Sequence, residues 1–214
     1  MGTTDEQKGH RWFAAWWNLQ TRLESGKLRE LRRAVVGPAR GRVLEIGCGT
    51  GTNFTLYSED AIEVVATDPD TYMLRRAVKG LTGASRPTVP CRAVAEHLPF
   101  KDASFDTVVS TVNFCTVPDP EAGLADIRRV LRPDGEYRFF DHVRYKNKFG
   151  AFWQDLATPV WRWCGAGCHP NRDIEGMIRG AGLAITELES LTPVPPIPPF
   201  IIVRPVIRGV ARRG

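Results

Sequence analysis

The sequence predicts an α/β fold in which a parallel sheet carries helices on both faces. Short apolar runs alternate with segments of helical periodicity from residue 43 onward, as in βαβ units whose strands pair in parallel. A second observation comes from residues 43–51, where an apolar run around Glu45 is followed by glycines at positions 47, 49 and 51. A buried strand that leads into a glycine turn is half of a nucleotide-binding unit.

The bulk composition is that of one soluble globular domain, with or without appendages. The chain has 214 residues, of which 43% are hydrophobic and 25% charged, and its net charge is +5. The basic residues are scattered, which is typical of solvated faces, so no nucleic-acid partner is expected. Residues 1–10 are too polar for a signal peptide and no run of about 18 apolar residues occurs, which predicts a cytoplasmic protein.

The five cysteines are expected to be free thiols, because their number is odd and no secretory signal accompanies them. Cys164, Cys168 and His169 stand close together in the sequence. Their spacing matches neither haem attachment nor a zinc finger, so no metal site is predicted.

Residues 1–40 are predicted to form an N-terminal helical lid ahead of a domain of residues 41–214. Large apolar side chains recur at helical spacing over residues 11–36, with arginines on the other face. One interpretation is that these helices only pack on the domain. The other is that the aromatic residues 12–17 cover the cofactor or touch a membrane surface, which would place the protein peripherally on a membrane.

Apolar runs and stop signals predict the remaining elements in order. Strands are expected at residues 43–46, 62–67, 89–94, 105–112, 136–141, 183–188 and 200–210. Helices are expected at residues 52–58, 71–79, 120–131 and 171–181, the last capped by Asn171. Pro90 suits an edge strand and Pro205 a bulge or an edge position, because proline cannot donate a hydrogen bond to a neighbouring strand.

The glycine turn favours S-adenosylmethionine over other nucleotide cofactors. A dinucleotide fingerprint would place its third glycine one residue later than Gly51, and a P-loop would need a Gly-Lys-Ser/Thr sequence that is absent. S-adenosylmethionine carries a sulfonium and an ammonium group and no phosphate, so the carboxylate of Glu45 near the turn is favourable. Asp68 follows the second strand, where a carboxylate can accept both ribose hydroxyls.

Five ordered motifs resemble those of the class I S-adenosylmethionine-dependent methyltransferases. They lie at residues 43–51, 66–69, 95–100, 105–108 and 129–135. The resemblance covers residues 41–143. It implies a Rossmann-like, mostly parallel sheet of seven strands with the last strand antiparallel, in agreement with the number of strands expected from the pattern. It also implies an enzyme whose cofactor is S-adenosyl-L-methionine.

The same resemblance implies which residues contact the cofactor. The glycines would line it, Asp68 would hold the ribose, and Ala95 and Glu96 would flank the adenine. Thr111 and Asn113 would face its methionine part. The complete set of expected cofactor-binding residues is Glu45, Gly47, Cys48, Gly49, Gly51, Asn53, Asp68, Pro69, Met73, Ala95, Glu96, Thr111 and Asn113.

Further segments are similar to the thiol S-methyltransferases of animals and their bacterial relatives. These segments lie at residues 48–54, 139–143, 152–168 and 203–211. The similarity implies a small thiol as the acceptor, although the animal members carry an N-terminal membrane segment that this chain lacks. His142, at the end of the fifth strand, is expected beside the acceptor as a base, with Asp141 orienting it. Cys115 is a candidate pocket wall, and the aromatic residues 149–163 are expected to line an apolar pocket or the core.

Three functions remain open from the sequence. The leading one is S-methylation of a small thiol or sulfide. The second is an O-, C- or N-methyltransferase for a quinone-type, phenolic or phospholipid acceptor, because the motif at residues 95–100 occurs widely among such enzymes. The third is a non-enzymatic S-adenosylmethionine-binding protein. Residues 111–114 lack the motif of amino-group DNA methylation, which disfavours that branch. The oligomeric state is not indicated.

Overall fold

The computed structural model describes residues 14–15, 26–165, 167–193 and 200–214. Most of the predicted N-terminal lid, including the aromatic residues 12 and 13 and residues 16 and 17, therefore lies outside the described residues. The first complete helix is α2, Gly26–Val36.

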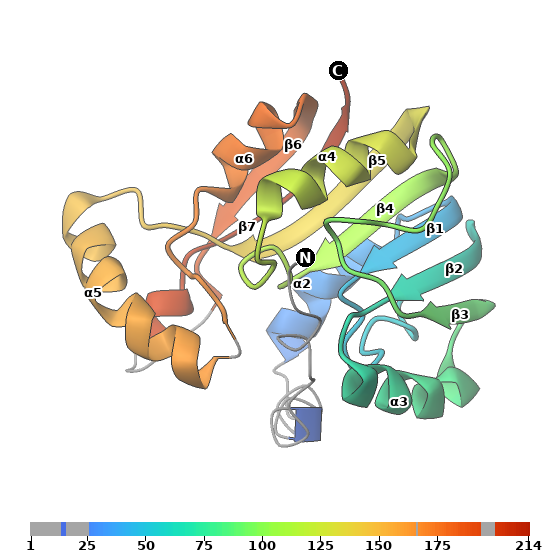
Figure 1. Cartoon of the computed structure of the whole chain (residues 1–214), viewed down its shortest axis with the longest axis horizontal. Helices are drawn as coiled ribbons and strands as arrows, with labels where there is room; N and C mark the ends of the chain where they lie inside the picture. Colours follow the sequence, from blue (N-terminus) through green and yellow to red (C-terminus); the bar gives the residue numbers. More distant parts are fainter. Residues whose placement is uncertain (1–13, 16–25, 166, 194–199) are drawn as a thin grey trace, which may run out of the picture.

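Seven strands form one mixed sheet in the order β3-β2-β1-β4-β5-β7-β6 (Figure 1). The strands are β1 Gly41–Ile46, β2 Ala61–Thr67, β3 Thr88–Cys91, β4 Phe105–Thr111, β5 Leu131–His142, β6 Leu183–Leu191 and β7 Val206–Arg213. β7 lies between β5 and β6 and runs antiparallel to both, whereas the other pairs are parallel. The predicted fold class is thus confirmed, including the antiparallel last strand and the edge position of the strand that contains Pro90.

Helices cover both faces of the sheet because successive strand residues point to opposite sides. The helices after α2 are α3 Thr71–Gly80, α4 Pro120–Val130, α5 Lys148–Cys164 and α6 Ile174–Gly180. α4 and α6 pack on one face with the buried Val108 of β4. The next residue of β4, Val109, packs with residues of α2 and α3 on the other face (Figure 1). This alternation forms the two apolar layers of the core.

The expected helix over residues 52–58 is wrong. Residues 50–56 form successive turns instead, with bonds from the Phe54 amide to the Gly51 carbonyl and from the Leu56 amide to the Asn53 carbonyl. Asn53, Phe54, Leu56 and Tyr57 are all buried. Hydrogen bonds from Asn53 and Tyr57 to the buried Glu45 carboxylate hold this turn conformation in place of a regular helix.

Several other element boundaries also differ from the expectation. β7 begins at Val206, directly after Pro205, and a short 3₁₀ helix, η2 Phe200–Val203, occupies the expected start of that strand. α6 is capped by Asp173, whose side chain accepts a bond from the Gly176 amide, rather than by Asn171. β3 ends at Cys91, before the expected residue 94. The proline has no N–H for a neighbouring strand, which accounts for the late start of β7.

Most of the aromatic residues 149–163 are not part of the core. They lie on α5, and Phe149, Phe152, Trp153 and Trp163 are all exposed. In the described part of the chain, no helix is long and apolar enough to cross a membrane.

Gly209 of β7 tests the packing of the antiparallel strands. A Cβ at this position would collide with the carbonyl oxygen of Glu187 and lie 2.8 Å from the Phe139 ring. We expect Gly209→Ala to lower the free energy of unfolding by about 1–3 kcal/mol, because the sheet must shift to admit the methyl group. Urea unfolding measures this change.

Gly180→Ala is the matched control, since a Cβ at Gly180 in α6 would meet nothing within 4 Å. It should leave stability unchanged or raise it, because alanine favours a helix. Equal effects of the two substitutions would contradict the crowding at Gly209.

Candidate cofactor and acceptor site

The sequence-predicted residues converge at the carboxyl edge of the parallel strands. The strand order reverses at β1, whose neighbours are β2 and β4. Ligands of open α/β sheets bind in the crevice beside such a reversal, outside the carboxyl ends of the strands. The turns that follow β1, β2, β4 and β5 supply most of the residues discussed below.

The glycine turn after β1 is closed against the loop after β4. Gly47 has a φ of +68°, a conformation that side chains rarely adopt. A Cβ at Gly47 would also collide with the carboxamide of Asn113. Glycine is therefore required at position 47 for two reasons, its backbone conformation and the close approach of Asn113.

Asp68 links the end of β2 to this turn. Its Oδ2 accepts a hydrogen bond of 2.9 Å from the Gly49 amide, and its Oδ1 accepts one of 2.9 Å from the Asp70 amide. Burial raises the pKa of Asp68 to about 6, although both amide bonds act in the opposite direction. Asp70 in turn caps α3 through the amides of Tyr72 and Met73. The carboxyl group of Asp68 is thus positioned by backbone amides on both sides.

Glu45 is buried beneath the turn and has two side-chain partners. Its oxygens accept hydrogen bonds of 2.9 Å from Asn53 Nδ2 and 2.8 Å from the Tyr57 hydroxyl. Burial raises the pKa of Glu45, while these two bonds and the charge of Arg32 lower it. Glu45 therefore holds residues 53–57 against β1.

Arg32 of α2 is a buried cation that sequence reasoning missed. Its guanidinium donates a hydrogen bond of 2.8 Å to Thr111 Oγ1, which also accepts one of 2.9 Å from Asn53 Nδ2. α2 carries several arginines at helical spacing, and nothing local distinguishes the buried one from those in solvent. Only its packing against β4 and β5 identifies it.

Asp141 fixes the loop after β4. Its oxygens accept hydrogen bonds from the amides of Asn113 at 3.1 Å, Phe114 at 2.6 Å and Cys115 at 3.3 Å. Burial raises the pKa of Asp141 to about 6, and these bonds oppose the rise. The same loop begins at Val112, a β-branched residue with a φ of +53°. Such strain persists only where neighbouring contacts enforce it, and Asp141 supplies those contacts.

His142 is the last residue of β5, and its backbone amide donates a hydrogen bond of 3.0 Å to Asp141 Oδ1. Its Nδ1 is buried and has no hydrogen-bond partner within the described portion of the chain. Burial, together with the charge of Arg32, lowers the pKa of His142 to about 4. The imidazole is therefore neutral at pH 7.

At this edge of the sheet, the buried amide atoms Asn53 Oδ1 and Asn113 Nδ2 also have no hydrogen-bond partner among the described residues. An unpaired buried polar group is costly, and its presence in a native structure needs an explanation such as a ligand. Both amides belong to the expected cofactor-binding set and lie in the turns after β1 and β4. A ligand with donors, acceptors and a cationic amino group fits this edge.

The remaining predicted residues pack around the same edge. Ala95 is buried against α4, near Gly123. Glu96 accepts a hydrogen bond of 3.2 Å from the Asp119 amide. The carbonyl of Pro69 accepts a bond of 3.1 Å from Arg92. Cys48 and Met73 are both buried, and burial raises the pKa of the Cys48 thiol well above its usual value.

Cys115 is fully buried in the loop after β4. Its hydrogen bond with Cys168, together with its burial, raises the pKa of its thiol, which disfavours a nucleophilic role. Cys48, Cys91, Cys115 and Cys168 are free thiols. Within the described residues no group of three His, Cys, Asp or Glu side chains could hold a metal ion.

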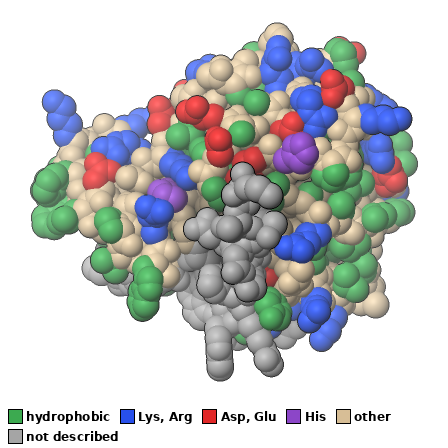
Figure 2. Space-filling view, in the orientation of Figure 1, with side chains coloured by type: hydrophobic (Ala, Val, Ile, Leu, Met, Phe, Trp, Pro, Cys, Tyr) green, Lys and Arg blue, Asp and Glu red, His purple; other side chains and the backbone are tan. Residues whose placement is uncertain are grey.

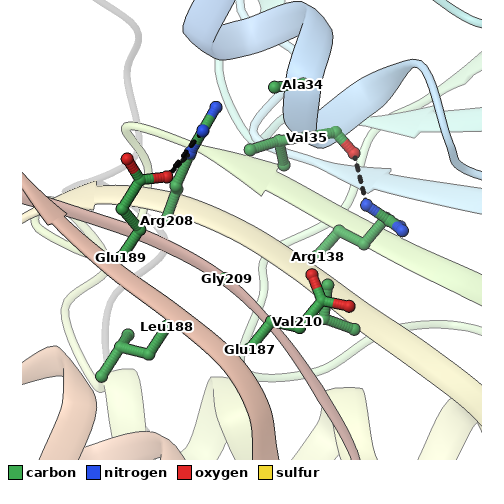
Figure 3. Close-up of a pocket in the computed structure, with 9 residues that line it drawn as sticks. All are labelled: Ala34, Val35, Arg138, Glu187, Leu188, Glu189, Arg208, Gly209 and Val210. Atoms are coloured by element: carbon green, nitrogen blue, oxygen red, sulfur yellow. Dashed lines mark hydrogen bonds and ion pairs between the residues drawn. The ribbon is translucent and has the colours of Figure 1, made fainter.

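A separate cavity of about 240 Å³ lies between α2 and strands β5, β6 and β7 (Figure 3). Its charged residues include Arg208, which pairs with Glu189, and Arg138, which donates to the Val35 carbonyl. None of the sequence-predicted site residues lines this cavity.

Comparisons with known proteins identify the family. A methyltransferase domain model matches residues 44–139. The chain is 33% identical to human thiol S-methyltransferase TMT1B over 89% of this chain and 79% of that protein. It is also 33% identical to phosphatidylethanolamine N-methyltransferase of Cereibacter sphaeroides over 78% of this chain and 84% of that protein.

The solved structure of an S-adenosylmethionine-dependent methyltransferase from Mesorhizobium loti has the same fold. Its TM-score is 0.65 at 19% identity, over 88% of this chain and 99% of that one. The seven-stranded sheet, the glycine turn and the similar proteins all indicate the same family. The chain therefore belongs to the class I S-adenosylmethionine-dependent methyltransferases, and S-adenosylmethionine is its cofactor.

Proposed function

We propose that this enzyme transfers a methyl group from S-adenosylmethionine to the sulfur of a small thiol or sulfide. The observation that carries the proposal is the 33% identity to a human thiol S-methyltransferase, which extends over 89% of this chain. The similarity reaches beyond the cofactor half, residues 44–139, into the segments that follow β5.

The proposed cofactor contacts use the edge described above. The backbone of Gly47, Gly49 and Gly51 lies against the cofactor, and Asp68 accepts hydrogen bonds from the ribose hydroxyls. The unpaired amides of Asn53 and Asn113 bond the methionine end, and Ala95 and Glu96 flank the adenine. Bound S-adenosylmethionine supplies an electrophilic methyl group on a cationic sulfur. The unpaired buried amides support this assignment, because each gains a partner.

The other residues of the predicted cofactor set are assigned supporting positions. Glu45 and Thr111 orient Asn53, because both accept bonds from its amide. Met73 and Pro69 follow Asp68 at the start of α3, and Cys48 fills the space beneath the turn. These residues fix the shape of the edge against which the cofactor binds.

The acceptor sulfur is proposed to lie beside His142 and Arg32. A thiolate is the nucleophile in such a transfer, and a neighbouring cation lowers the pKa of a thiol. The buried charge of Arg32 acts in this direction. Neutral His142 offers the lone pair of its unpaired Nδ1 to the S–H proton. Asp141 acts as a positioning residue, since its oxygens hold the loop of residues 113–115.

A phospholipid amine is the second candidate acceptor. It is favoured by the 33% identity to a bacterial phosphatidylethanolamine N-methyltransferase, of which the chain covers 84%. A neutral base beside the acceptor would suit an amine as well, because an ammonium group must lose a proton before it attacks.

An acceptor panel separates these functions. The enzyme is incubated with methyl-labelled S-adenosylmethionine and, in separate reactions, sulfide, an alkyl thiol, a phenol, a quinol and phosphatidylethanolamine vesicles. We expect label on sulfide or the alkyl thiol. Label on the lipid, phenol or quinol alone would replace the thiol by that acceptor. Cofactor binding without any labelled product would support a binding protein instead of an enzyme.

Cofactor affinity should fall on acidification below about pH 6. Burial raises the pKa of Asp68 to about 6, and only its ionised form accepts both ribose hydroxyls. Calorimetric affinity should therefore decrease by at most about tenfold per pH unit below that value. Asp68→Asn should weaken binding about 10- to 100-fold at pH 8, because charged hydrogen bonds are lost.

Comparing the pH profiles of the wild type and Asp68→Asn separates the contribution of Asp68 from that of Asp141, whose pKa is also raised to about 6. The part of the acid dependence that Asp68→Asn removes belongs to Asp68. Asp134→Asn, at an exposed position near the start of β5, should bind as the wild type does. An unchanged pH profile in Asp68→Asn would contradict the ribose assignment.

Removal of the His142 side chain should slow transfer without affecting the cofactor. We expect His142→Ala to lower kcat with a thiol by about tenfold or more, because the acceptor proton loses its partner. Affinity for S-adenosylhomocysteine should stay at the wild-type value. Because the pKa of His142 is about 4, its titration should leave no inflection in kcat between pH 5 and pH 8. Normal turnover would remove His142 from the mechanism.

A further inference from the structure

Helix α5 carries an apolar face that no described element covers. Its exposed side chains include Trp163 at 89%, Phe149 at 76%, Val160 at 70%, Phe152 and Leu156 at 60% each and Trp153 at 51%. Single exposed apolar residues are common on protein surfaces, whereas a continuous row on one helix marks an interaction site.

The helical period places these side chains together on one side. At about 100° per residue, positions 149, 152, 153, 156, 159, 160 and 163 fall within an arc of about 120°. Pro159 is the only one of these that is not a large side chain, and none is polar. We call this set the outer face of α5.

The opposite side of α5 anchors it to the domain. Ala151, Gln154 and Thr158 are buried there. Gln154 Nε2 donates hydrogen bonds of 2.8 Å to the carbonyls of Pro170 and Ile202, and its Oε1 accepts one of 2.9 Å from the Tyr145 amide. The helix is therefore held in a fixed orientation by its polar stripe, and this orientation directs the outer face away from the domain.

Basic residues border the outer face. On the helical projection the exposed Lys148 lies about 20° and the exposed Arg162 about 60° from the edge of the outer face, and the exposed Lys146 precedes the helix. Asp155 lies on the same border, but both of its oxygens bond the Arg144 guanidinium, at 2.5 and 2.6 Å. Because Asp155 is paired, the net charge of the described residues along this border is positive. The whole chain has a net charge of +5.

We propose that the outer face of α5 binds the surface of an anionic phospholipid bilayer. Interfacial helices combine Trp, Phe and Leu on one face with Lys or Arg beside it, so that the rings enter the acyl boundary while the cations meet lipid phosphates. α5 has this distribution, and hydrophobic side chains gather over it at the left of Figure 2. The helix lies on the membrane rather than across it, since no described helix is long and apolar enough to span one.

This surface is close in sequence to the proposed acceptor site. β5 ends at His142 and α5 begins at Lys148, and Gln154 of α5 bonds the carbonyl of Val143 at 3.1 Å. α5 projects from the side of the molecule beyond β6 and β7 (Figure 1). Membrane binding of α5 would therefore bring the end of β5 toward the lipid surface. The proposal does not depend on the identity of the acceptor.

Vesicle flotation with the full chain tests the proposal. Equal parts of phosphatidylcholine and phosphatidylglycerol form the anionic vesicles, and phosphatidylcholine alone forms the neutral ones. The wild type should float with anionic vesicles and more weakly with neutral ones. Leu156→Gln combined with Trp163→Gln should lower the partition coefficient about tenfold or more, because two apolar side chains no longer enter the lipid.

Matched variants distinguish vesicle binding by the outer face from vesicle binding by any exposed apolar side chain. Ile62 and Val78 are 69% and 52% exposed on β2 and α3. Ile62→Gln combined with Val78→Gln should bind vesicles as the wild type does. Lys148→Glu combined with Arg162→Glu should reduce binding to anionic vesicles and leave binding to neutral ones unchanged. Equal thermal melting of all variants verifies that they are folded.

Three results would overturn the proposal. The first is a wild type that floats with neither kind of vesicle. The second is an equal loss of binding in the variants of β2 and α3. The third is a wild-type dimer in sedimentation equilibrium that Leu156→Gln with Trp163→Gln dissociates, without any binding to vesicles. That last result would identify the outer face as a contact between two copies of the chain.

Discussion

Buried carboxylates at the carboxyl edge of the sheet hold the loops on which the rest of the site depends. Glu45, Asp68 and Asp141 stand at or just past the ends of β1, β2 and β5. Each is at most 7% exposed, and each accepts hydrogen bonds from the turn after its own or a neighbouring strand. Without these acceptors, amides in three separate turns would lie buried and unpaired, which is costly.

The same arrangement carries a free-energy cost that a ligand can offset. Burial raises the pKa of Asp68 and of Asp141 from 3.8 to about 6. A rise of about two units corresponds to roughly 3 kcal/mol less stability for each ionised carboxylate, relative to the unfolded chain. Unpaired amide atoms on Asn53 and Asn113 add to this cost. The loops at this edge are thus held in place while some of their buried polar atoms still lack hydrogen-bond partners, as expected for a site that binds a polar ligand.

α5 illustrates a different balance between anchoring and exposure. One buried glutamine holds the helix through hydrogen bonds to the carbonyls of Val143, Pro170 and Ile202, the last of which lies in η2. Polar anchoring frees the apolar side chains of α5 from packing on the domain. The helix can therefore present them outward while the strand that ends at His142 stays in place.

The sequence by itself determined the fold class and which edge of the sheet the predicted site residues share. Alternating strand and helix patterns predicted all seven strands in the correct order, because period and stop signals are local properties. The predicted glycines and Asp68 do meet beside the strand reversal, since the ends of parallel strands share one edge. The prediction of a helix at residues 52–58 was wrong because Asn53 and Tyr57 donate hydrogen bonds to Glu45, a residue outside their own segment.

Only the tertiary structure decided which polar residues are buried and which apolar residues are exposed. Arg32 looks like any other arginine of α2 until its bond to Thr111, 79 residues away, is seen. The aromatic residues of α5 are of the types usually found in a protein core. Most of them nevertheless face solvent, because the opposite side of the helix packs on the domain. Burial depends on contacts between distant parts of the chain, and local sequence patterns do not record such contacts.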